Sequence, residues 1–396
     1  WQAPSVVLAS GGVGKAYIVT SNSWEYTGDG HSLALSAGGS LINMEFVQFH
    51  PTGMVWPISV KGILVTESVR GDGGVLLNSE GRRFMYDYIP DFFKKETSES
   101  EAEGDRWYDD KKNNRRPAEL LPRDEVARAI NAEVKAGRGS PHGGVFLDIA
   151  NRRTPEFIRK RLPSMYHQFM ELAGVDITKE PMEIGPTCHY VMGGVEVDPD
   201  SQAAVVEGLY AAGEVSGGMH GSNRLGGNSL SDLLVFGKRA GESAAQRATT
   251  AQRNALTSDQ LAQAEAEALQ PFEPGGENPY AVWDELRGAM QELVGIIRNG
   301  EEVKQALTTI ERLKTKRLTA EGGRAFNPGW HLALDMRNML RVSECIAKAA
   351  LEREESRGGH TRDEFPAADP EWGRTNLVCT LNDDNSISLT RKPLPQ

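Results

Sequence analysis

Two short apolar segments, each followed at once by glycines, constrain the fold of this chain most strongly. Residues 5–9 (SVVLA) lead into the glycine-rich loop 10–14, and residues 208–213 (GLYAAG) lead into a loop that is dense in glycine from 217 to 227. Short apolar runs that end in glycine are typical of buried strands in an α/β sheet. A helix is expected to begin at Asn228 after the second loop, so the sequence predicts an α/β fold around these two strands.

Segments of alternating or apolar residues, bounded by glycine or proline, predict further strands. The segment MEFVQFHPTG, residues 44–53, alternates like a strand and is expected to stop at Pro51. Residues 62–78 have the pattern of a strand, a glycine-rich turn and a second strand, and residues 183–213 return to strand patterns. The predicted strands are therefore spread over the first 213 residues.

Helices are predicted by apolar residues at helical spacing and by residues that favour helix starts. Residues 123–137 have a helical pattern. Residues 155–173 follow Thr154, a good N-cap, with Pro155 at the first helical position. Apolar residues recur at helical spacing through 259–352, which predicts a helical bundle with charged outer faces.

Residues 94–117 differ from the rest of the chain. The segment is polar, acidic first and basic later, and it has few apolar residues that would anchor it in a core. We interpret it as a solvated surface insertion. Its basic run, residues 111–116, is open to a second interpretation as a patch for a partner.

Composition excludes several classes of function. The 44 basic and 55 acidic residues give a formal charge of −11, which argues against nucleic-acid binding because that affinity comes from clustered basic side chains. No run of about 18 apolar residues is present, so no segment is expected to span a bilayer. Cys188, Cys345 and Cys379 are too far apart in the sequence for a zinc or iron–sulfur ligand set, and they favour a reducing compartment over a disulfide scaffold.

The chain begins at Trp1 rather than at a methionine, and it has no signal or transit segment. Within a few residues it enters the first predicted strand. Because chains rarely begin inside a core element, we expect that further sequence precedes Trp1 or is supplied elsewhere in an assembly.

The two glycine-rich loops are candidate binding sites for an anionic group. The second loop leads to a helix N-terminus, where free backbone N–H groups and the helix dipole favour a nucleotide phosphate or the N1/C2-oxygen edge of a flavin. Both loops are equally open to interpretation as ordinary tight turns, and no GxGxxG follows a leading strand. Glu214, directly after a strand, is either an acceptor for a cofactor hydroxyl or a capping or salt-bridge carboxylate.

Basic and imidazole side chains recur beside glycines. Two histidines and two arginines that converge would clamp a small dicarboxylate, because the planar guanidinium group matches a carboxylate. Glu67 lies near arginines and is either a proton relay or a buried ion-pair partner. Taken singly, each of these side chains is more typical of a structural role. The candidate residues are His50, Thr66, Glu67, Arg70, Arg123, His189 and Arg224.

A set of motifs that occurs in order along nearly the whole chain resembles one known family. The motifs are MEFVQFHPTG, GILVTESVRGDGG, GRRF, the pair Arg123-Asp124, HYVMGGVEVD, GLYAAGE, HGSNRLGGNSL and ESRGGHTR. Together they resemble the flavoprotein subunit of succinate dehydrogenase and fumarate reductase, although no single motif would suffice.

The resemblance implies an α/β FAD-binding domain of the FAD/NAD(P)-binding type, interrupted by an α+β capping domain. A C-terminal helical bundle domain and a C-terminal tail would follow. The implied boundaries are 1–55 and 186–250 for the FAD-binding domain, 56–185 for the capping domain with its insertion 94–117, 255–355 for the helical domain and 356–396 for the tail.

The resemblance also implies roles for individual residues. The residues that would hold the dicarboxylate are His50, Thr66, His189 and Arg224. The residues that would contact FAD are Asp29, Glu214, Asn228, Ser229 and Leu230. Arg123 would transfer the proton, which would pass through Glu67 and Arg70. Since arginine normally has a pKa above about 12, this role requires that Arg123 is desolvated beside another cation and hands its proton quickly to Glu67.

The implied reaction is the oxidation of succinate to fumarate, or the reverse, by hydride transfer between a substrate carbon and N5 of FAD. Electrons would pass to an iron–sulfur subunit, which alone would hold the clusters, and then to a membrane quinone. These steps belong to electron transport and the tricarboxylic acid cycle. Through that partner and its membrane anchor subunits, the chain would lie peripherally on the cytoplasmic or matrix side of the membrane.

The sequence departs from the family pattern in three places. The N-terminal glycine fingerprint and the histidine that the family uses for covalent flavin attachment are not in this chain, so a covalent attachment site would lie outside it. Residues 94–117 are an insertion, and a few extra residues separate His50 from Thr66.

Two other functions stay open on the sequence. An L-aspartate oxidase-type flavoenzyme shares motifs of the HPTG and HGxNR kind, but no group that would recognise the substrate amine is identified. A non-enzymatic protein would retain the fold without the chemistry, and the joint presence of all the catalytic-type residues argues against it. A flavin spectrum that succinate bleaches and L-aspartate does not would separate the dehydrogenase from the oxidase.

Overall fold

The chain forms two compact units in a computed structural model that describes residues 2–252 and 255–394. Unit 1 comprises Trp1–Ile18, Asn22–Gln48 and Tyr190–Gln396, and unit 2 comprises Val19–Ser21 and Phe49–His189. The whole of the segment 56–185, for which the sequence predicts a capping domain, lies in unit 2. Most of the predicted FAD-binding domain and the whole predicted helical domain share the other unit.

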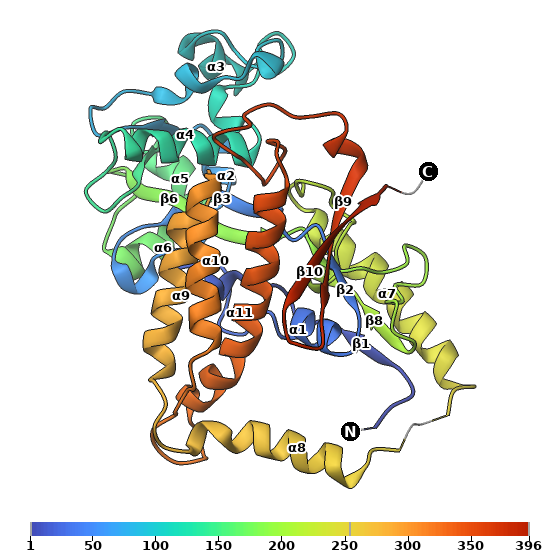
Figure 1. Ribbon diagram of the computed structural model, residues 1–396. Helices are drawn as coiled ribbons and strands as arrows, with labels where there is room; N and C mark the ends of the chain where they lie inside the picture. The colour runs from blue at the N-terminus through green and yellow to red at the C-terminus, as the bar shows by residue number, and fades with distance from the viewer. Residues whose placement is uncertain (1, 253–254, 395–396) are drawn as a thin grey trace. The chain divides into compact units, whose positions relative to one another are not determined.

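Two sheets form the strand layers of unit 1 (Figure 1). One is the parallel pair of β1 (Val6–Leu8) and β8 (Leu209–Ala211), the two strands predicted from the glycine-terminated apolar segments. The other has the order β10-β9-β2-β7 with antiparallel neighbours. Its strands are β2 (Ser40–Ile42), β7 (Gly194–Val195), β9 (Thr375–Leu381) and β10 (Ile387–Pro393).

Helices make up most of the rest of unit 1, and α9, α10 and α11 pack side by side (Figure 1). Asparagine N-caps start all three, because the side chains of Asn278, Asn299 and Asn327 accept backbone N–H groups of the first turn. The bundle predicted over 259–352 is thus confirmed. The helices of unit 1 are α1 (Asp29–Ser36), α7 (Asn228–Ala248), α8 (Ser258–Leu269), α9 (Pro279–Leu293), α10 (Gly300–Lys314) and α11 (Pro328–Glu352).

Unit 2 is built on a sheet of order β3-β6-β5-β4, which belongs to this unit except for a few end residues of β3 and β6. Its strands are β3 (Val47–Met54), β4 (Val75–Leu77), β5 (Val145–Asp148) and β6 (Met182–Val191). Its helices are α2 (Ser68–Gly71), α3 (Glu101–Trp107), α4 (Arg123–Lys135), α5 (Pro155–Arg161) and α6 (Pro163–Ala173). A large apolar core joins the sheet to α2, α4, α5 and α6 through fully buried residues such as Val69, Ile130, Leu147 and Ile158.

Two strand predictions are wrong. The strand expected to stop at Pro51 continues to Met54, because β3 is an edge strand and an edge tolerates the missing N–H group of proline. The strand–turn–strand predicted over 62–78 contains only one strand, β4, and the single helical turn α2 lies where the glycine-rich turn was expected to begin.

Two further expectations need correction. The helix predicted over 155–173 begins at its N-cap Thr154, as expected, but it is split into α5 and α6 because Pro163 has no N–H group to continue the ladder. The strand β1 was expected to be buried, yet Val6 and Val7 are 48% and 39% exposed, since among the described strands only β8 pairs with it.

Two kinds of feature are absent from the described ranges 2–252 and 255–394. No helix there is long and apolar enough to cross a membrane. No group of three or more His, Cys, Asp and Glu side chains in those ranges could hold a metal ion. Cys188, Cys345 and Cys379 lie within these ranges, are buried and form no disulfide there.

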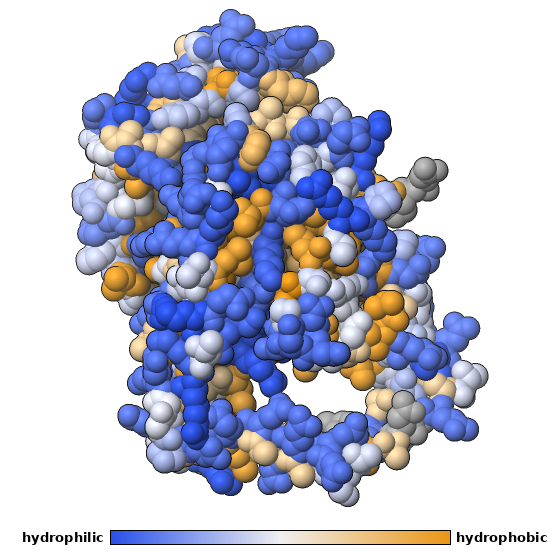
Figure 2. All heavy atoms as spheres, viewed as in Figure 1, coloured by the Kyte–Doolittle hydropathy of each residue, from blue (hydrophilic) through white to orange (hydrophobic). Residues whose placement is uncertain are grey.

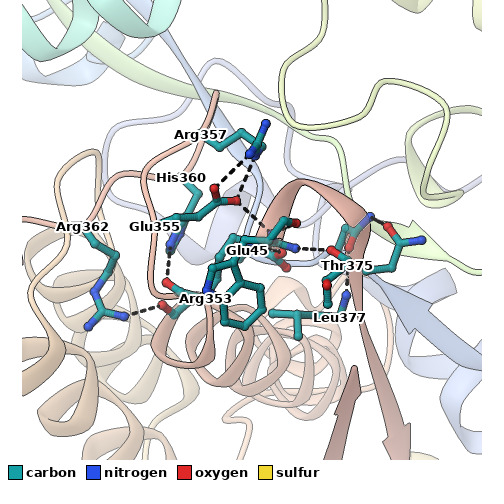
Figure 3. Close-up of polar contacts among 12 residues, drawn as sticks. Glu45, Arg353, Glu355, Arg357, His360, Arg362, Thr375 and Leu377 are labelled. Atoms are coloured by element: carbon teal, nitrogen blue, oxygen red, sulfur yellow. Dashed lines mark hydrogen bonds and ion pairs between the residues drawn. The ribbon is translucent and has the colours of Figure 1, made fainter. Parts of the chain in front are cut away.

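A buried ionic network joins the end of α11 to distant segments of unit 1 (Figure 3). Arg353 is 1% exposed, and its Nε donates to Glu45 Oε1 (2.6 Å) while Nη1 donates to Glu355 Oε1 (3.1 Å). The same guanidinium group donates to the carbonyl oxygens of Trp372 and Thr375, so all three of its nitrogens have acceptors. Both carboxylates are fully buried; Arg353 pairs with both of them, and the partly exposed Arg357 also pairs with Glu355 (2.9 Å).

We expect Arg353→Met to lower the free energy of unfolding by about 3–5 kcal/mol, because the fully buried Glu45 loses its ion pair and Glu355 keeps only Arg357. Arg391 provides a matched control, since its ion pair with Glu352 is exposed and Arg391→Met should cost at most about 1 kcal/mol. Urea unfolding of the two variants measures the difference. A loss for Arg353→Met no larger than that of the control would contradict a structural role for the network.

Candidate active site

His50 and His189 lie close together in unit 2, with ring centres 5.4 Å apart in an edge-to-face arrangement. His50 is on β3, is 1% exposed and places Nδ1 3.1 Å from the carbonyl oxygen of Thr52. Burial lowers the pKa of His50 well below its usual value, and the positive charges of Arg123 and Arg70 lower it further. His50 is therefore a neutral imidazole near two cations.

His189, near the end of β6, is oriented by Ser21, whose Oγ lies 2.8 Å from Nδ1 of the ring. Residues 19–21 run beside β6, because the Cys188 N–H donates to the Val19 carbonyl (2.8 Å) and the Ser21 N–H donates to the Cys188 carbonyl (2.9 Å). The sequence analysis missed Ser21. No motif marks it, and its partner is 168 positions away in the chain.

A carboxylate between two arginines is the most charged part of the site in unit 2. Arg123 Nε donates to Glu67 Oε2 (3.2 Å), and Arg70 Nη2 lies 4.0 Å from the same oxygen. Arg123 is the first residue of α4, while Glu67 directly precedes α2 and Arg70 lies on it. Thr66 shapes the same turn, since its Oγ1 accepts the backbone N–H of Ser68 (3.3 Å). The turn that holds Glu67 and Arg70 and the start of α4, 56 positions after Glu67, thus bring three charged groups together.

The three groups differ in their access to water. The side chain of Glu67 is 44% exposed, that of Arg123 is 17% exposed and that of Arg70 is 1% exposed. Burial lowers the pKa of Arg70, although the neighbouring Glu67 opposes this. The carboxylate is thus the member of the cluster that exchanges protons with solvent most readily.

Several guanidinium N–H groups in this cluster have no acceptor. Arg70 Nη1 donates to the carbonyl oxygen of Glu119. The remaining Arg70 nitrogens, Nε and Nη2, and Nη1 of Arg123 are buried without a hydrogen-bond partner within the part of the chain that the structure describes. A buried donor without an acceptor is costly. The arrangement therefore fits an anion that supplies acceptors to both arginines.

Arg224 belongs to unit 1 and is held by residues that the sequence analysis did not identify. Its Nη2 donates to Gln48 Oε1 (3.0 Å), and Gln48 Nε2 donates back to the Arg224 carbonyl oxygen (2.7 Å). The guanidinium carbon lies 4.6 Å from the centre of the Tyr190 ring. The residue is 4% exposed, so its side chain has one defined orientation within unit 1.

Glu214 lies in unit 1, in a short helical turn after β8, and is 8% exposed. Its Oε1 accepts the backbone N–H of Val191 (3.0 Å). Burial raises the pKa of Glu214 to about 7, despite that hydrogen bond and the charge of Arg224. A Cβ atom at Gly12 would lie 2.2 Å from Oε1, so the first glycine-rich loop comes directly against this carboxylate and only glycine fits there.

Two helix starts in unit 1 carry the other residues implied to contact FAD. The helix α7 begins at Asn228 after Gly227, which has a left-handed conformation (φ 84°), and no side chain caps it. Ser229 and Leu230 follow, and Leu230 is 67% exposed. Asp29 begins α1, and its Oδ1 accepts from Thr27 Oγ1 (3.1 Å) and from Asn338 Nδ2 (2.8 Å). An uncapped helix start and a buried carboxylate in a glycine cradle fit a flavin nucleotide.

Two protein families match most of this chain. The FAD binding domain family matches residues 1–230, and the family named fumarate reductase flavoprotein C-term matches residues 283–395. The two matched segments contain every residue discussed above for the site. They also contain β1 and the helical bundle from residue 283, within α9, onward.

Relatives and a solved structure agree with these matches. A fumarate reductase (CoM/CoB) chain of Methanothermobacter marburgensis is 43% identical over 401 residues, which cover 100% of this chain and 65% of that protein. The fumarate reductase flavoprotein subunit of Escherichia coli is 38% identical over 372 residues, covering 91% and 58%. The structure of Mycobacterium smegmatis Sdh1 in complex with UQ1 matches with a TM-score of 0.83 and 60% identity, covering 100% and 62%.

The chain spans about three fifths of the length of the relatives it matches. Within that span, the similarity extends from the first glycine-rich loop to the end of the C-terminal segments. The chain therefore belongs to the family of flavoprotein subunits of succinate dehydrogenase and fumarate reductase.

Proposed function

We propose that this chain is the catalytic flavoprotein part of an enzyme that interconverts succinate and fumarate with FAD as its cofactor. The observation that carries the proposal is the cluster of Glu67, Arg70 and Arg123 near the neutral His50. Its buried guanidinium N–H groups lack partners among the described residues, which fits a small anionic substrate and a proton-transfer step.

The spare donors suit a carboxylate in charge and in geometry. A guanidinium group presents paired N–H donors that match the two oxygens of a carboxylate. A neutral imidazole at His50 adds a hydrogen-bonding group without adding a further charge next to Arg70 and Arg123. The residues to which we assign dicarboxylate binding are His50, Thr66, His189 and Arg224.

We assign proton transfer at the substrate carbon to Arg123. Its side chain is largely shielded from water, and Arg70 places a second positive charge in the same cluster. The hydrogen bond from Arg123 Nε to Glu67 Oε2 then gives the proton a direct acceptor, and the 44% exposed Glu67 passes it to water. In fumarate reduction the proton moves along the same groups in the opposite direction. Arg70 lies on the other side of Glu67 and stabilises its charge.

The residues of unit 1 fit FAD, which supplies the two-electron redox chemistry when it is bound. Glu214 is placed to accept a hydrogen bond from a ribityl or ribose hydroxyl group, since Oε1 lies against the glycine cradle at Gly12. The uncapped start of α7 offers a positive dipole end to negative charge. The residues to which we assign FAD contacts are Asp29, Glu214, Asn228, Ser229 and Leu230.

We assign the onward electron carriers to partner subunits. Cys188, Cys345 and Cys379 are buried thiols scattered along the sequence, which gives no iron–sulfur ligand set among them. Membrane anchor subunits together with an iron–sulfur subunit would then take the electrons to a quinone and hold the chain at the cytoplasmic or matrix face of a membrane. The similar Sdh1 structure contains UQ1, which supports a quinone as the final acceptor.

The direct test uses the purified flavin-loaded complex under anaerobic conditions. Succinate is expected to bleach the flavin absorbance, and fumarate is expected to restore it. L-aspartate should leave the spectrum unchanged. Bleaching by L-aspartate alone would assign the protein to the aspartate oxidases instead, and no response to either compound would overturn the proposal.

Arg123→Lys is expected to lower kcat by at least about 100-fold, because the ammonium group cannot keep both the reach and the planar geometry of the proton-transfer group. The FAD content should stay normal. Arg128→Lys is the matched control on the same helix, since Arg128 pairs with Asp124 and Glu125 rather than with Glu67. Steady-state succinate oxidation measures both variants. Equal turnover for Arg123→Lys and the wild type would exclude the assigned role.

The raised pKa of Glu214 predicts a pH-dependent stability. The folded-state pKa of about 7 lies above the usual 4.5, so the protonated form stabilises the flavin-free fold below about pH 4.5, and this contribution is lost as the pH rises through 7. Glu214→Gln cannot ionise. The free energy of unfolding of Glu214→Gln, relative to that of the wild type, should therefore rise by about 3 kcal/mol between pH 5 and pH 8.5.

Urea unfolding of the flavin-free chain at the two pH values measures this gain. Glu207→Gln is the control, because Glu207 is exposed and pairs with Arg247 at the surface. The same pH dependence in both variants would show that Glu214 is not the group responsible.

A further inference from the structure

The polar segment 94–117 contains a tyrosine that contacts the turn carrying Glu67 and Arg70. Tyr108 follows α3, and its hydroxyl group donates to the carbonyl oxygen of Arg70 (2.7 Å). Figure 2 shows a mostly hydrophilic surface on the visible face around α3, where Figure 1 places this segment. The tyrosine is an exception, since it points inward and is only partly exposed.

The helical turn α2, which receives this hydrogen bond, is too short to be stable on its own. The helix α2 has four residues, and an isolated helix of that length is unstable because its nucleation costs more than its few hydrogen bonds return. The carbonyl oxygens of Val69 and Arg70 accept the backbone N–H groups of Gly74 (2.9 Å) and Gly73 (3.2 Å). Tyr108 adds a side-chain donor to the Arg70 carbonyl oxygen, and Arg153 Nε donates to the carbonyl oxygen of Asp72, the residue after α2 (2.8 Å).

The two donors are held next to each other. The Arg153 guanidinium carbon lies 5.4 Å from the centre of the Tyr108 ring, so the cation faces the ring as its Nε reaches the turn. One turn earlier on α3, Asp105 pairs with Arg152 (2.5 Å) and with Arg83 (2.9 Å). The helix α3 is therefore fixed to the body of unit 2 close to Tyr108.

The same body holds the other end of Arg70. Glu119 is fully buried, accepts from Arg83 Nε and Nη2 (2.5 and 3.0 Å), and uses its carbonyl oxygen to accept from Arg70 Nη1. Arg70 is thus held at its guanidinium group by Glu119 and at its backbone by Tyr108. Both contacts define where Glu67 lies, because Glu67 is three residues away on the same turn.

We propose that Tyr108 is a positioning residue for proton transfer, and that the segment 94–117 braces the α2 turn so that Glu67 stays within hydrogen-bond reach of Arg123. This inference rests on the proposed function for its catalytic consequence. The Arg123–Glu67 distance of 3.2 Å is already at the upper end of the range for efficient proton transfer. A shift of the turn by a fraction of an ångström would therefore slow the relay.

The test compares Tyr108→Phe with Tyr86→Phe in the flavin-loaded complex. Both changes remove one hydroxyl group that is bonded in the same part of unit 2, but the Tyr86 hydroxyl contacts Ser98 Oγ (3.0 Å) and not the α2 turn. Hydrogen–deuterium exchange is measured on peptides covering residues 66–74. Tyr108→Phe should speed exchange of these amides at least about 5-fold, and Tyr86→Phe should leave them unchanged.

Kinetics of succinate oxidation test the catalytic half of the inference. Tyr108→Phe should lower kcat about 3–10-fold with KM within about 2-fold, and the solvent deuterium isotope effect on kcat should rise because proton transfer becomes more limiting. A merely structural defect would lower the active fraction without changing the isotope effect.

The outcomes separate the inference from the proposed function. If Tyr108→Phe left hydrogen–deuterium exchange of residues 66–74 unchanged, or if both variants exchanged equally, segment 94–117 would not stabilise the α2 turn. This conclusion would hold whatever the activity. Faster exchange with an unchanged isotope effect would overturn the positioning role. A wild-type complex without succinate or fumarate turnover would overturn the proposed function and with it the positioning role, while the exchange data would still decide the brace.

Discussion

Guanidinium groups buried away from water organise both units, and Arg353 differs from Arg70 and Arg123 in whether its nitrogens have acceptors. In unit 1, Arg353 has an acceptor for each of its nitrogens and holds Glu45 and Glu355 in a closed network (Figure 3). In unit 2, Arg70 and Arg123 keep buried N–H groups without partners among the described residues. A satisfied buried arginine joins segments, whereas an unsatisfied one leaves a demand for an anion. One residue type therefore marks a structural network in one unit and a candidate active site in the other.

This demand for an anion also accounts for the charge state of the neighbouring residues. An imidazolium ion at His50 would be repelled by the guanidinium groups of Arg70 and Arg123. Burial and these two cations therefore lower the pKa of His50. The negative charge of Glu67 offsets part of the repulsion between Arg70 and Arg123, but it is partly solvated and meets only some of their donors. The cluster as a whole stays positive and incomplete, which is the state expected of a site that binds an anionic substrate and exchanges a proton with water.

Sequence patterns correctly predicted those helices and strands that are determined by residues close together in the sequence. The N-cap Thr154, the bundle over 259–352 and the two glycine-terminated strands depend on residues within a few positions of one another. Two of the errors depend on the partners of an element, whereas the break at Pro163 has a local cause that the sequence analysis overlooked. Whether a strand passes through Pro51 depends on its place at a sheet edge, and the exposure of Val6 depends on what pairs with β1.

In the candidate site too, residues marked by a local motif could be predicted, and residues whose role depends on a distant partner could not. Glu67, Arg70 and Arg123 could be named from their charge and their motifs. Ser21 and Tyr108 could not, because serine and tyrosine in polar segments are common, and each acts on a partner far away in the chain. Their role comes from where the fold places one hydroxyl group, which no local pattern encodes.

The segment 94–117 shows why a polar composition does not by itself mean a solvated loop. Its acidic first half and basic second half meet in space, since Arg115 pairs with Glu103 (2.8 Å) and with Glu99 (3.0 Å). The pairs of Arg115 with Glu99 and Glu103 fold the segment back on itself. A segment that folds in this way can present one inward-pointing side chain, Tyr108, to a turn that has too few residues to be stable alone. The charge pattern that first indicated a surface insertion is thus also the means by which the insertion can support the structure beneath it.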